Sequence, residues 1–289
     1  MNLHPKKIKI VEVGPRDGLQ NEKGIVSTAD KVRFIDLLTE AGLPVIEAGS
    51  FVHPKWVPQL ADSADVYSKI KKKAGVMYPM LVPNLKGFER AVAAGVSAIA
   101  VFTAASETFN KKNINKTVRE SLDGIRSIVE AARREKMWVR GYVSTCFVCP
   151  YEGKILPEKV LPVVEALSGF GVDEISIGDT IGAAVPADVE KLLSVVGTDP
   201  AFAGSPLLAV HFHNTHGMAL ANIRQSLQMG IAIVDSSAGG LGGCPYAPGA
   251  SGNVATEDVL RLLHDMGIET GVDLEKVIEA SQFIRKILG

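Results

Sequence analysis

Short apolar runs rich in β-branched residues alternate with longer amphipathic stretches along the whole chain. Eight such runs predict strands, at residues 8–13, 45–49, 77–82, 98–103, 139–145, 174–178, 208–213 and 232–236. They begin about 32 residues apart on average, which is the length of a strand, a helix and two short loops. Residues 28–41, 117–136 and 186–196 have the apolar spacing of helices that cover a sheet.

Glycines separate several of the predicted helices from the strands that follow them. Gly42, Gly95, Gly171 and Gly230 each come after a helical pattern and a few residues before a predicted strand. Glycine readily takes the left-handed conformation that ends a helix. Eight strand–helix units without a break in composition predict an α/β protein with a single domain over residues 1–289, folded as one (β/α)8 TIM barrel. A doubly wound sheet is the alternative, and the count of eight disfavours it.

Composition narrows the class of protein further. Of the 289 residues, 46% are hydrophobic and 22% are charged, so the chain has material for a large core and disorder is excluded. A formal net charge of −1 argues against a nucleic-acid partner. No uncharged apolar run reaches the roughly 20 residues that cross a bilayer, and the first residues lack the apolar segment of a signal peptide. Three cysteines do not make a disulfide framework. We therefore expect a cytoplasmic protein without a membrane partner.

In a barrel of this kind, catalytic side chains lie where the strands end. Arg16 and Asp17 follow the first predicted strand in a turn that contains three glycine or proline residues. An ordinary polar loop with a local ion pair is an equally open interpretation. Glu47 lies inside an apolar run, where an unpaired carboxylate costs several kcal/mol. Arg16, at the end of the neighbouring strand, is its expected partner.

The seventh predicted strand ends in His211-Phe-His213. Residues two apart on a strand point to the same face, so both imidazoles can converge on one metal ion. A hydrogen-bonded pair of histidines packed in the barrel is the alternative, and the position at a strand end favours the metal pair. Asp179 ends the sixth strand, either as a carboxylate that orients another group or as a structural cap.

A glycine-rich segment follows the eighth predicted strand. Residues 239–253 include six glycines and two prolines. One interpretation is a phosphate cradle; the other is a lid loop that carries Cys244, with Asn253 at its far hinge. A free cysteine is usually a buried hydrophobic residue, which fits such a loop poorly. Cys146 and Cys149 form a Cys-x-x-Cys pair, but a structural zinc site needs four ligands. We therefore expect both near the site without a metal.

Together these residues resemble the 3-hydroxy-3-methylglutaryl-CoA lyase family, within a metal-dependent barrel group of carbon–carbon lyases and Claisen-type synthases. The matching motifs are VGPRDGLQNE at 13–22, IEAGSFVHPKW at 46–56, CPYEG at 149–153, HFH at 211–213 and GGLGGCPYAPGASGNVATE at 239–257. The resemblance covers nearly the whole chain. It implies cleavage of an acyl-CoA thioester to acetyl-CoA and acetoacetate. A lyase for a bulkier substrate and a Claisen-type synthase are the alternatives.

The resemblance also implies the roles of individual residues. The implied ligands of a divalent ion, Mg²⁺ or Mn²⁺, are Asp17, His211, His213 and Asn253. The implied catalytic residues are Arg16 and Cys244. The group that takes the hydroxyl proton is left open among Asp17, His211 and a bound water. The residues expected to bind substrate are Arg16 and Gln20. The residues expected to hold the site in place are Glu47, Asp179 and Glu257. We also expect a homodimer.

The chemistry of these groups is consistent with such a reaction. One carboxylate, two imidazoles and one amide leave about two of six octahedral positions open for substrate. An arginine beside the site can neutralise enolate charge as it develops, which is usually the largest catalytic contribution.

Overall fold

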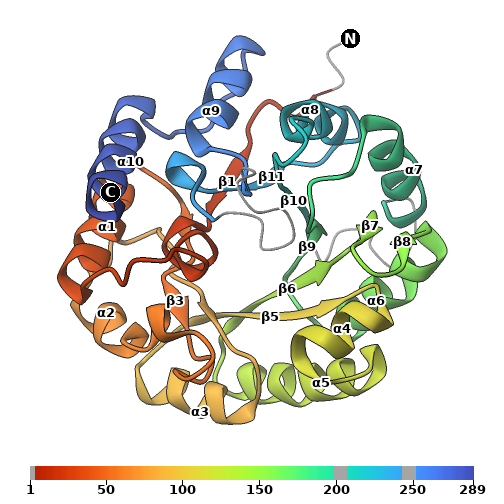
Figure 1. The fold of residues 1–289 in the computed structure, drawn as a ribbon, viewed down its shortest axis with the longest axis horizontal. Helices are drawn as coiled ribbons and strands as arrows, with labels where there is room; N and C mark the ends of the chain where they lie inside the picture. Colours follow the sequence, from red (N-terminus) through yellow and green to blue (C-terminus); the bar gives the residue numbers. More distant parts are fainter. Residues whose placement is uncertain (1–3, 198–206, 243–251) are drawn as a thin grey trace.

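The computed structural model describes residues 4–197, 207–242 and 252–289, and its central feature is a parallel sheet that closes into a barrel (Figure 1). The sheet runs in the order β2-β1-β11-β10-β9-β6-β5-β4-β3. Its strands are β1 (Lys9–Glu12), β2 (Val45–Ile46), β3 (Gly49–Ser50), β4 (Met80–Leu81), β5 (Ala98–Ala104), β6 (Trp138–Ser144), β9 (Glu174–Asp179), β10 (Leu207–Phe212) and β11 (Ile233–Ser236).

The two ends of this strand order, β2 and β3, are halves of one predicted strand. Only Glu47 and Ala48 separate them, and these two residues continue the hydrogen bonding on both sides. Glu47 N donates to Glu12 O on β1, and Ala48 N donates to Pro79 O next to β4. The sheet therefore closes on itself, and the predicted α/β barrel is confirmed. The predicted strand at 45–49 differs only in being interrupted at its centre.

Helices surround the barrel in a ring (Figure 1). They are α1 (Thr28–Glu40), α2 (Ser63–Lys69), α3 (Leu85–Ala93), α4 (Glu107–Ile114), α5 (Val118–Arg134), α6 (Pro157–Phe170), α7 (Pro186–Val196), α8 (Ala219–Gln228), α9 (Thr256–Asp265) and α10 (Leu274–Leu288). Short elements complete the rim: η1 (Gly14–Gly18), η2 (Pro58–Leu60), η4 (Ala238–Gly240) and the hairpin of β7 (Val148–Cys149) and β8 (Gly153–Lys154).

Local sequence signals explain where the helices begin and end. Thr117 and Glu120 form a reciprocal capping box at the start of α5. Proline in the first turn starts α6 and α7, where its missing N–H is no loss. Gly171 has φ 86° and ends α6 in the left-handed conformation. Within the described residues, no helix is both long and apolar enough to cross a membrane.

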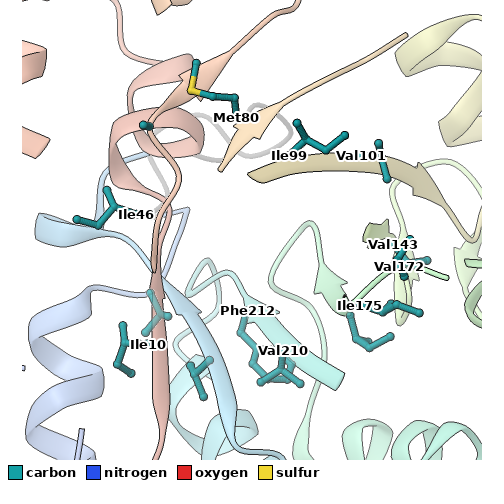
Figure 2. Close-up of a cluster of buried hydrophobic side chains, with 14 of the residues drawn as sticks. Ile10, Ile46, Met80, Ile99, Val101, Val143, Val172, Ile175, Val210 and Phe212 are labelled. Carbon is teal, nitrogen blue, oxygen red and sulfur yellow. The ribbon is translucent and has the colours of Figure 1, made fainter. Parts of the chain in front are cut away.

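The apolar core lies between the strands and the surrounding helices. Ile10, Ile46, Ile99, Ile175 and Val210 are fully buried there (Figure 2). Their neighbours on alternate strand positions point the other way, into the barrel. A smaller apolar cluster fills part of the barrel interior, and it consists of Val11, Val13, Val45, Ala209 and Ile233.

A third apolar cluster, of Leu81, Ala100 and Tyr142, lies on β4, β5 and β6, and charged side chains are buried beside it. Arg140, in the middle of β6, is 1% exposed and pairs with two buried carboxylates, Glu174 and Asp235. An ionised side chain is stable in such a place only with partners that satisfy it. This network extends from Glu174, where β9 begins, to Asp235, which contacts His211.

Candidate metal centre and catalytic site

The turn after β1 places Arg16 and Asp17 at the carboxyl end of the barrel. The backbone N–H groups of Arg16, Asp17 and Gly18 all point to Val13 O. Glycines are needed here for space: a Cβ on Gly18 would lie 2.8 Å from Ser237 Oγ. The turn is therefore packed tightly against the residues that follow β11, and the two functional side chains are held by its shape.

Asp17, His211 and His213 converge on one point at this end of the barrel. Each offers a ligand atom, and the three atoms lie within 4.8 Å of one another. Asn253 joins them, because its Nδ2 donates to Asp17 Oδ2 at 2.9 Å and its backbone bridges to that of His213. The structure thus brings together the four residues that the family resemblance implies as metal ligands.

The protonation states of this cluster suit a divalent cation. Burial alone would raise the pKa of Asp17, but Arg16 and the two histidines hold it well below its usual range. Burial and the neighbouring His211 lower the pKa of His213 to about 4, so its imidazole is neutral near pH 7. A carboxylate and a neutral imidazole are the forms that bind a metal.

The two histidines are held differently. His211 Nδ1 lies 3.3 Å from Asp235 Oδ2, which leaves Nε2 as its free nitrogen. Burial lowers the pKa of His211, but the bond to Asp235 outweighs this and raises it overall. His213 Nδ1 is buried without a hydrogen-bond partner among the described residues. Such an orphaned nitrogen is costly unless a ligand satisfies it, so the residues present fit a metal ion.

Arg16 lies beside the cluster and is fixed by two carboxylates. Its Nη1 donates to Asp17 Oδ1 and its Nε donates to Glu47 Oε2, both at 2.7 Å. This is the pairing of Arg16 with Glu47 that the sequence predicts. Tyr142 also donates to Glu47 Oε2, at 3.2 Å. Burial raises the pKa of Glu47 and Arg16 opposes that rise.

Behind the cluster lies a network that sequence reasoning missed. Arg140 donates to both oxygens of Asp235, at 2.5 and 3.0 Å, and to the Tyr142 hydroxyl at 2.7 Å. Burial would raise the pKa of Asp235, but Arg140 lowers it to about 2. The network joins Glu47, and through it Arg16, to the carboxylate that orients His211. The signal was available, because Arg140 and Asp235 each interrupt an apolar strand.

The structure also locates the residues expected to bind substrate or to support the site. Asp179 accepts from the backbone N–H groups of Ala183 and Ala184, both at 3.1 Å, which is the pattern of a structural cap. Burial raises its pKa to about 6. Glu257 accepts from Gly239 N at the start of the glycine-rich segment. Gln20 is half-buried, just after η1.

The three cysteines divide into two groups. Cys244 and the centre of the predicted lid loop lie outside the described residues. Cys146 and Cys149 are buried, and Cys146 Sγ donates to Val143 O at 3.0 Å. Burial raises the pKa of Cys146 to about 12. Cys149 Sγ lies 3.0 Å from Ser106 Oγ. Neither reaches the metal cluster through any of these contacts.

Comparisons with known proteins agree with the resemblance seen in the sequence. Residues 7–284 match the family model described as HMGL-like. A mitochondrial hydroxymethylglutaryl-CoA lyase of Macaca fascicularis is 56% identical over 288 residues, which cover 100% of this chain and 88% of that protein. A cytoplasmic 3-hydroxy-3-methylglutaryl-CoA lyase of Danio rerio is 55% identical over 285 residues, which cover 98% of this chain and 84% of that protein.

Solved structures show the same likeness. The hydroxymethylglutaryl-CoA lyase of Pseudomonas aeruginosa matches with a TM-score of 0.96 and 51% identity, covering 99% of this chain and 95% of that one. An HMG-CoA lyase of Acinetobacter baumannii, solved with coenzyme A and 3-methylmalate, matches with a TM-score of 0.90 and 39% identity, covering 98% and 92%.

Proposed function

This chain belongs to the HMGL-like family, and from that premise we propose that it cleaves 3-hydroxy-3-methylglutaryl-CoA to acetyl-CoA and acetoacetate. The single observation that carries the proposal is the convergence of Asp17, His211 and His213 beside Arg16 at the carboxyl end of the barrel. The relatives give no support to a synthase or to a lyase for a bulkier substrate.

The residues proposed to hold the divalent ion are Asp17, His211, His213 and Asn253. When bound, Mg²⁺ or Mn²⁺ would act as a Lewis acid that lowers the pKa of the substrate hydroxyl. Two imidazoles among the ligands favour Mn²⁺ in affinity. The group that would receive the hydroxyl proton is Asp17, His211 or a bound water. Asp235 fixes the tautomer of His211 through Nδ1, so His211 could accept a proton only on Nε2, the nitrogen that the ion would otherwise take.

Arg16 is the residue proposed to stabilise the transition state. When the carbon–carbon bond breaks, negative charge moves onto the thioester enolate. Arg16 is 7% exposed, and its guanidinium is held by Glu47 and Asp17, so it needs no reorganisation when that charge appears. Glu47 acts as a positioning residue, since its hydrogen bonds among the described residues are to Arg16 and Tyr142.

Cys244 is proposed to protonate the acetyl-CoA enolate on carbon, as the thiol on the glycine-rich segment. Cys244→Ala is expected to keep metal affinity and to lose activity ~10²–10⁴-fold, as for a lost acid–base group. Alkylation should inactivate the enzyme, and bound substrate should slow that inactivation. Cys146→Ala and Cys149→Ala are the controls, because both thiols are buried. Near-normal turnover of Cys244→Ala would show that the reaction requires the loop and not the thiol.

One assay tests the proposed reaction directly. Protein freed of metal with a chelator is incubated with 3-hydroxy-3-methylglutaryl-CoA, and acetoacetate is measured before and after Mn²⁺ or Mg²⁺ is added. We expect acetoacetate only with the divalent ion. Equal activity without the ion would show that the reaction needs no metal. Absence of acetoacetate under both conditions would overturn the proposed function.

We also propose a homodimer located in the cytoplasm. The names of the relatives give a mitochondrial location for the Macaca fascicularis enzyme and a cytoplasmic one for the Danio rerio enzyme. Sedimentation equilibrium of the purified chain tests the dimer, and fractionation of the source cells tests the location.

A further inference from the structure

Tyr142 spans the barrel interior from β6 toward the strand that carries Glu47. Arg140 and Tyr142 are two residues apart on β6, so both side chains point to the same face of the strand, the interior. The ring of Tyr142 packs with Leu81 on β4 and Ala100 on β5 in one buried apolar cluster. These are the two strands that separate β6 from β3, so the ring crosses both of them on its way to Glu47.

The hydroxyl of Tyr142 lies between a cation and a carboxylate. It accepts from Arg140 Nη1 at 2.7 Å and donates to Glu47 Oε2 at 3.2 Å. Because arginine has donors only, the proton of the hydroxyl must point to Glu47. Both partners are charged and buried, so each of these hydrogen bonds is stronger than one between neutral groups.

Tyr142 is one of two groups that hold the Glu47 carboxylate. Among the described residues, the Glu47 side chain has two hydrogen bonds, both at Oε2, from Arg16 Nε and from the Tyr142 hydroxyl. Its Oε1 is buried and has no hydrogen-bond partner in the described part of the chain. Without the tyrosine hydroxyl, the direction of this carboxylate would be set only by Arg16, the group that it positions.

The balance of charge gives Tyr142 a second effect on Arg16. The Arg16 guanidinium contacts two carboxylates, Asp17 and Glu47, which together outweigh its single positive charge. The hydrogen bond from Tyr142 withdraws part of the Glu47 charge, and Arg140 polarises that hydroxyl from behind. Arg16 therefore keeps more of its positive field for negative charge that forms at the reacting centre.

The ring of Tyr142 also contacts two residues of the site. The guanidinium carbon of Arg16 lies 5.5 Å from the ring centroid, as in a cation–π pair. The imidazole of His211 meets the ring edge-on, with the two centroids 6.4 Å apart. Phenylalanine at this position would keep the ring and remove only the hydroxyl, so the two contributions can be separated by experiment.

We propose that Tyr142 is a positioning residue for Arg16 and acts on it through Glu47. Its hydroxyl fixes the direction of the Glu47 carboxylate and brings part of the Arg140 charge to it. The inference rests on the proposed function in one point, that Arg16 stabilises the enolate charge. Because that charge forms only in the transition state, loss of the hydroxyl should affect kcat more than KM.

Tyr142→Phe tests the hydroxyl in the reaction. We expect kcat for 3-hydroxy-3-methylglutaryl-CoA to fall ~10-fold or more, as for loss of a hydrogen bond to a charged group, with little change in KM. Tyr78→Phe is the matched control, because the Tyr78 hydroxyl is also buried between two partners, Thr39 Oγ1 and Lys73 N, both at 3.1 Å. This control should keep kcat. An unchanged kcat in Tyr142→Phe would overturn the proposal.

A double-mutant cycle shows whether Tyr142 acts through Glu47. In a Glu47→Ala background, Tyr142→Phe should lower kcat less than ~2-fold, because the group through which the hydroxyl acts is absent. A purely structural loss would lower kcat by the same factor in both backgrounds. Equal factors would therefore contradict the positioning role.

NMR spectroscopy tests the same inference without turnover. In protein labelled with ¹⁵N-arginine, the Nε–H resonance of Arg16 is identified by its loss in Arg16→Gln. Tyr142→Phe should shift this resonance and speed the exchange of its proton with solvent, and Tyr78→Phe should do neither. An Arg16 resonance that is the same in the wild type and in Tyr142→Phe would overturn the positioning.

The outcomes separate this inference from the proposed function. Acetoacetate formation with equal kcat in the wild type and in Tyr142→Phe overturns the role of Tyr142 and leaves the lyase reaction standing. A shifted Arg16 resonance in a protein that forms no acetoacetate overturns the proposed function and supports the positioning of Arg16 by Tyr142.

Discussion

Arg16 is the side chain in which the proposed metal site meets the charged interior of the barrel. One edge of its guanidinium contacts Asp17 and another contacts Glu47. Burial alone would lower the pKa of Arg16, but these two carboxylates raise it above its ordinary value. Arg16 therefore stays charged, and its guanidinium is held in one orientation. A planar fork that bridges two carboxylates cannot be replaced by lysine without loss of one contact.

We expect Arg16→Gln to lower kcat by ~10²–10³-fold, because it removes a group that acts on charge formed in the transition state. Metal affinity should change little, since the proposed ligands remain. Steady-state kinetics and calorimetric titration with Mn²⁺ measure the two quantities. Arg16→Lys should recover part of kcat. If kcat survives in Arg16→Gln and only KM rises, Arg16 is a binding residue and the enolate role is wrong.

At the scale of elements, strand register decides which buried groups meet. His211 on β10 lies opposite Asp235 on β11, and Arg140 on β6 lies opposite Glu174 on β9. Because β9 and β10 lie between β6 and β11, Arg140 reaches Asp235 across the barrel interior. The strands thereby carry a single network from the middle of the barrel to a proposed metal ligand.

Arg140→Met should lower the free energy of unfolding by about 3–5 kcal/mol, because it removes the buried arginine that pairs with Asp235 and leaves Glu174 with Lys9 alone. Denaturant unfolding followed by circular dichroism measures the change. Arg261→Met breaks an exposed pair with Asp258 and should cost less than about 1 kcal/mol. A similar small cost at Arg140 would show that the interior is hydrated enough to tolerate unpaired carboxylates.

Glu12 ties the end of β1 to the segments after β11. Its Oε1 accepts from Gly14 N and Ala238 N at 2.8 Å, and its Oε2 lies 2.7 Å from the Thr256 hydroxyl. Thr256 Oγ1 is in turn 2.8 Å from Ser236 Oγ. Burial raises the pKa of Glu12 from 4.5 to about 7, although these hydrogen bonds oppose the rise. A protonated Glu12 can donate to Thr256, which then donates to Ser236.

The folded protein therefore holds this proton more tightly than the unfolded chain. The contribution of Glu12 to stability is complete below pH 4.5 and falls as the pH rises to about 7, by about 3 kcal/mol. Glu12→Gln resembles the protonated form and should be more stable than the wild type at pH 8, with the difference vanishing toward pH 4.5. Chemical denaturation across this range measures it. Glu158→Gln, on an exposed position of α6, is the control. A difference independent of pH would refute the assignment.

At the scale of the whole molecule, barrel closure brings the proposed ligands together. Asp17 follows the first strand of the chain, whereas His211, His213 and Asn253 come from its last third. These residues meet only when β1 pairs with β11, which itself pairs with β10. An ion that binds this set favours the closed barrel over any opened form.

Mn²⁺ should therefore raise the melting temperature. At a free concentration of 100 times Kd, binding adds about 2.7 kcal/mol, which corresponds to roughly 5 °C for a chain of this size. Differential scanning calorimetry measures the shift. His213→Ala should lose most of it, and His216→Ala, an exposed histidine three residues on, should keep it. An undiminished shift in His213→Ala would exclude His213 as a ligand.

Local patterns in the sequence were sufficient for much of the fold and for part of the site. Strand and helix periodicity, with glycines that end helices, predicted the barrel, because these signals act over a few residues. The apolar surroundings of Glu47 predicted its partner Arg16, and the spacing of His211 and His213 put both on one face. Each of these deductions needs only the chain nearby or the order of strands.

Tertiary structure alone decided how distant segments meet. The pairing of Arg140 with Asp235 and the raised pKa of Glu12 both depend on strand register and on side chains far apart in sequence. Periodicity predicts which face of a strand or helix a side chain occupies. It does not predict which residue of another strand lies opposite. A pKa depends on burial and on every neighbouring charge, and both are fixed only when the barrel closes.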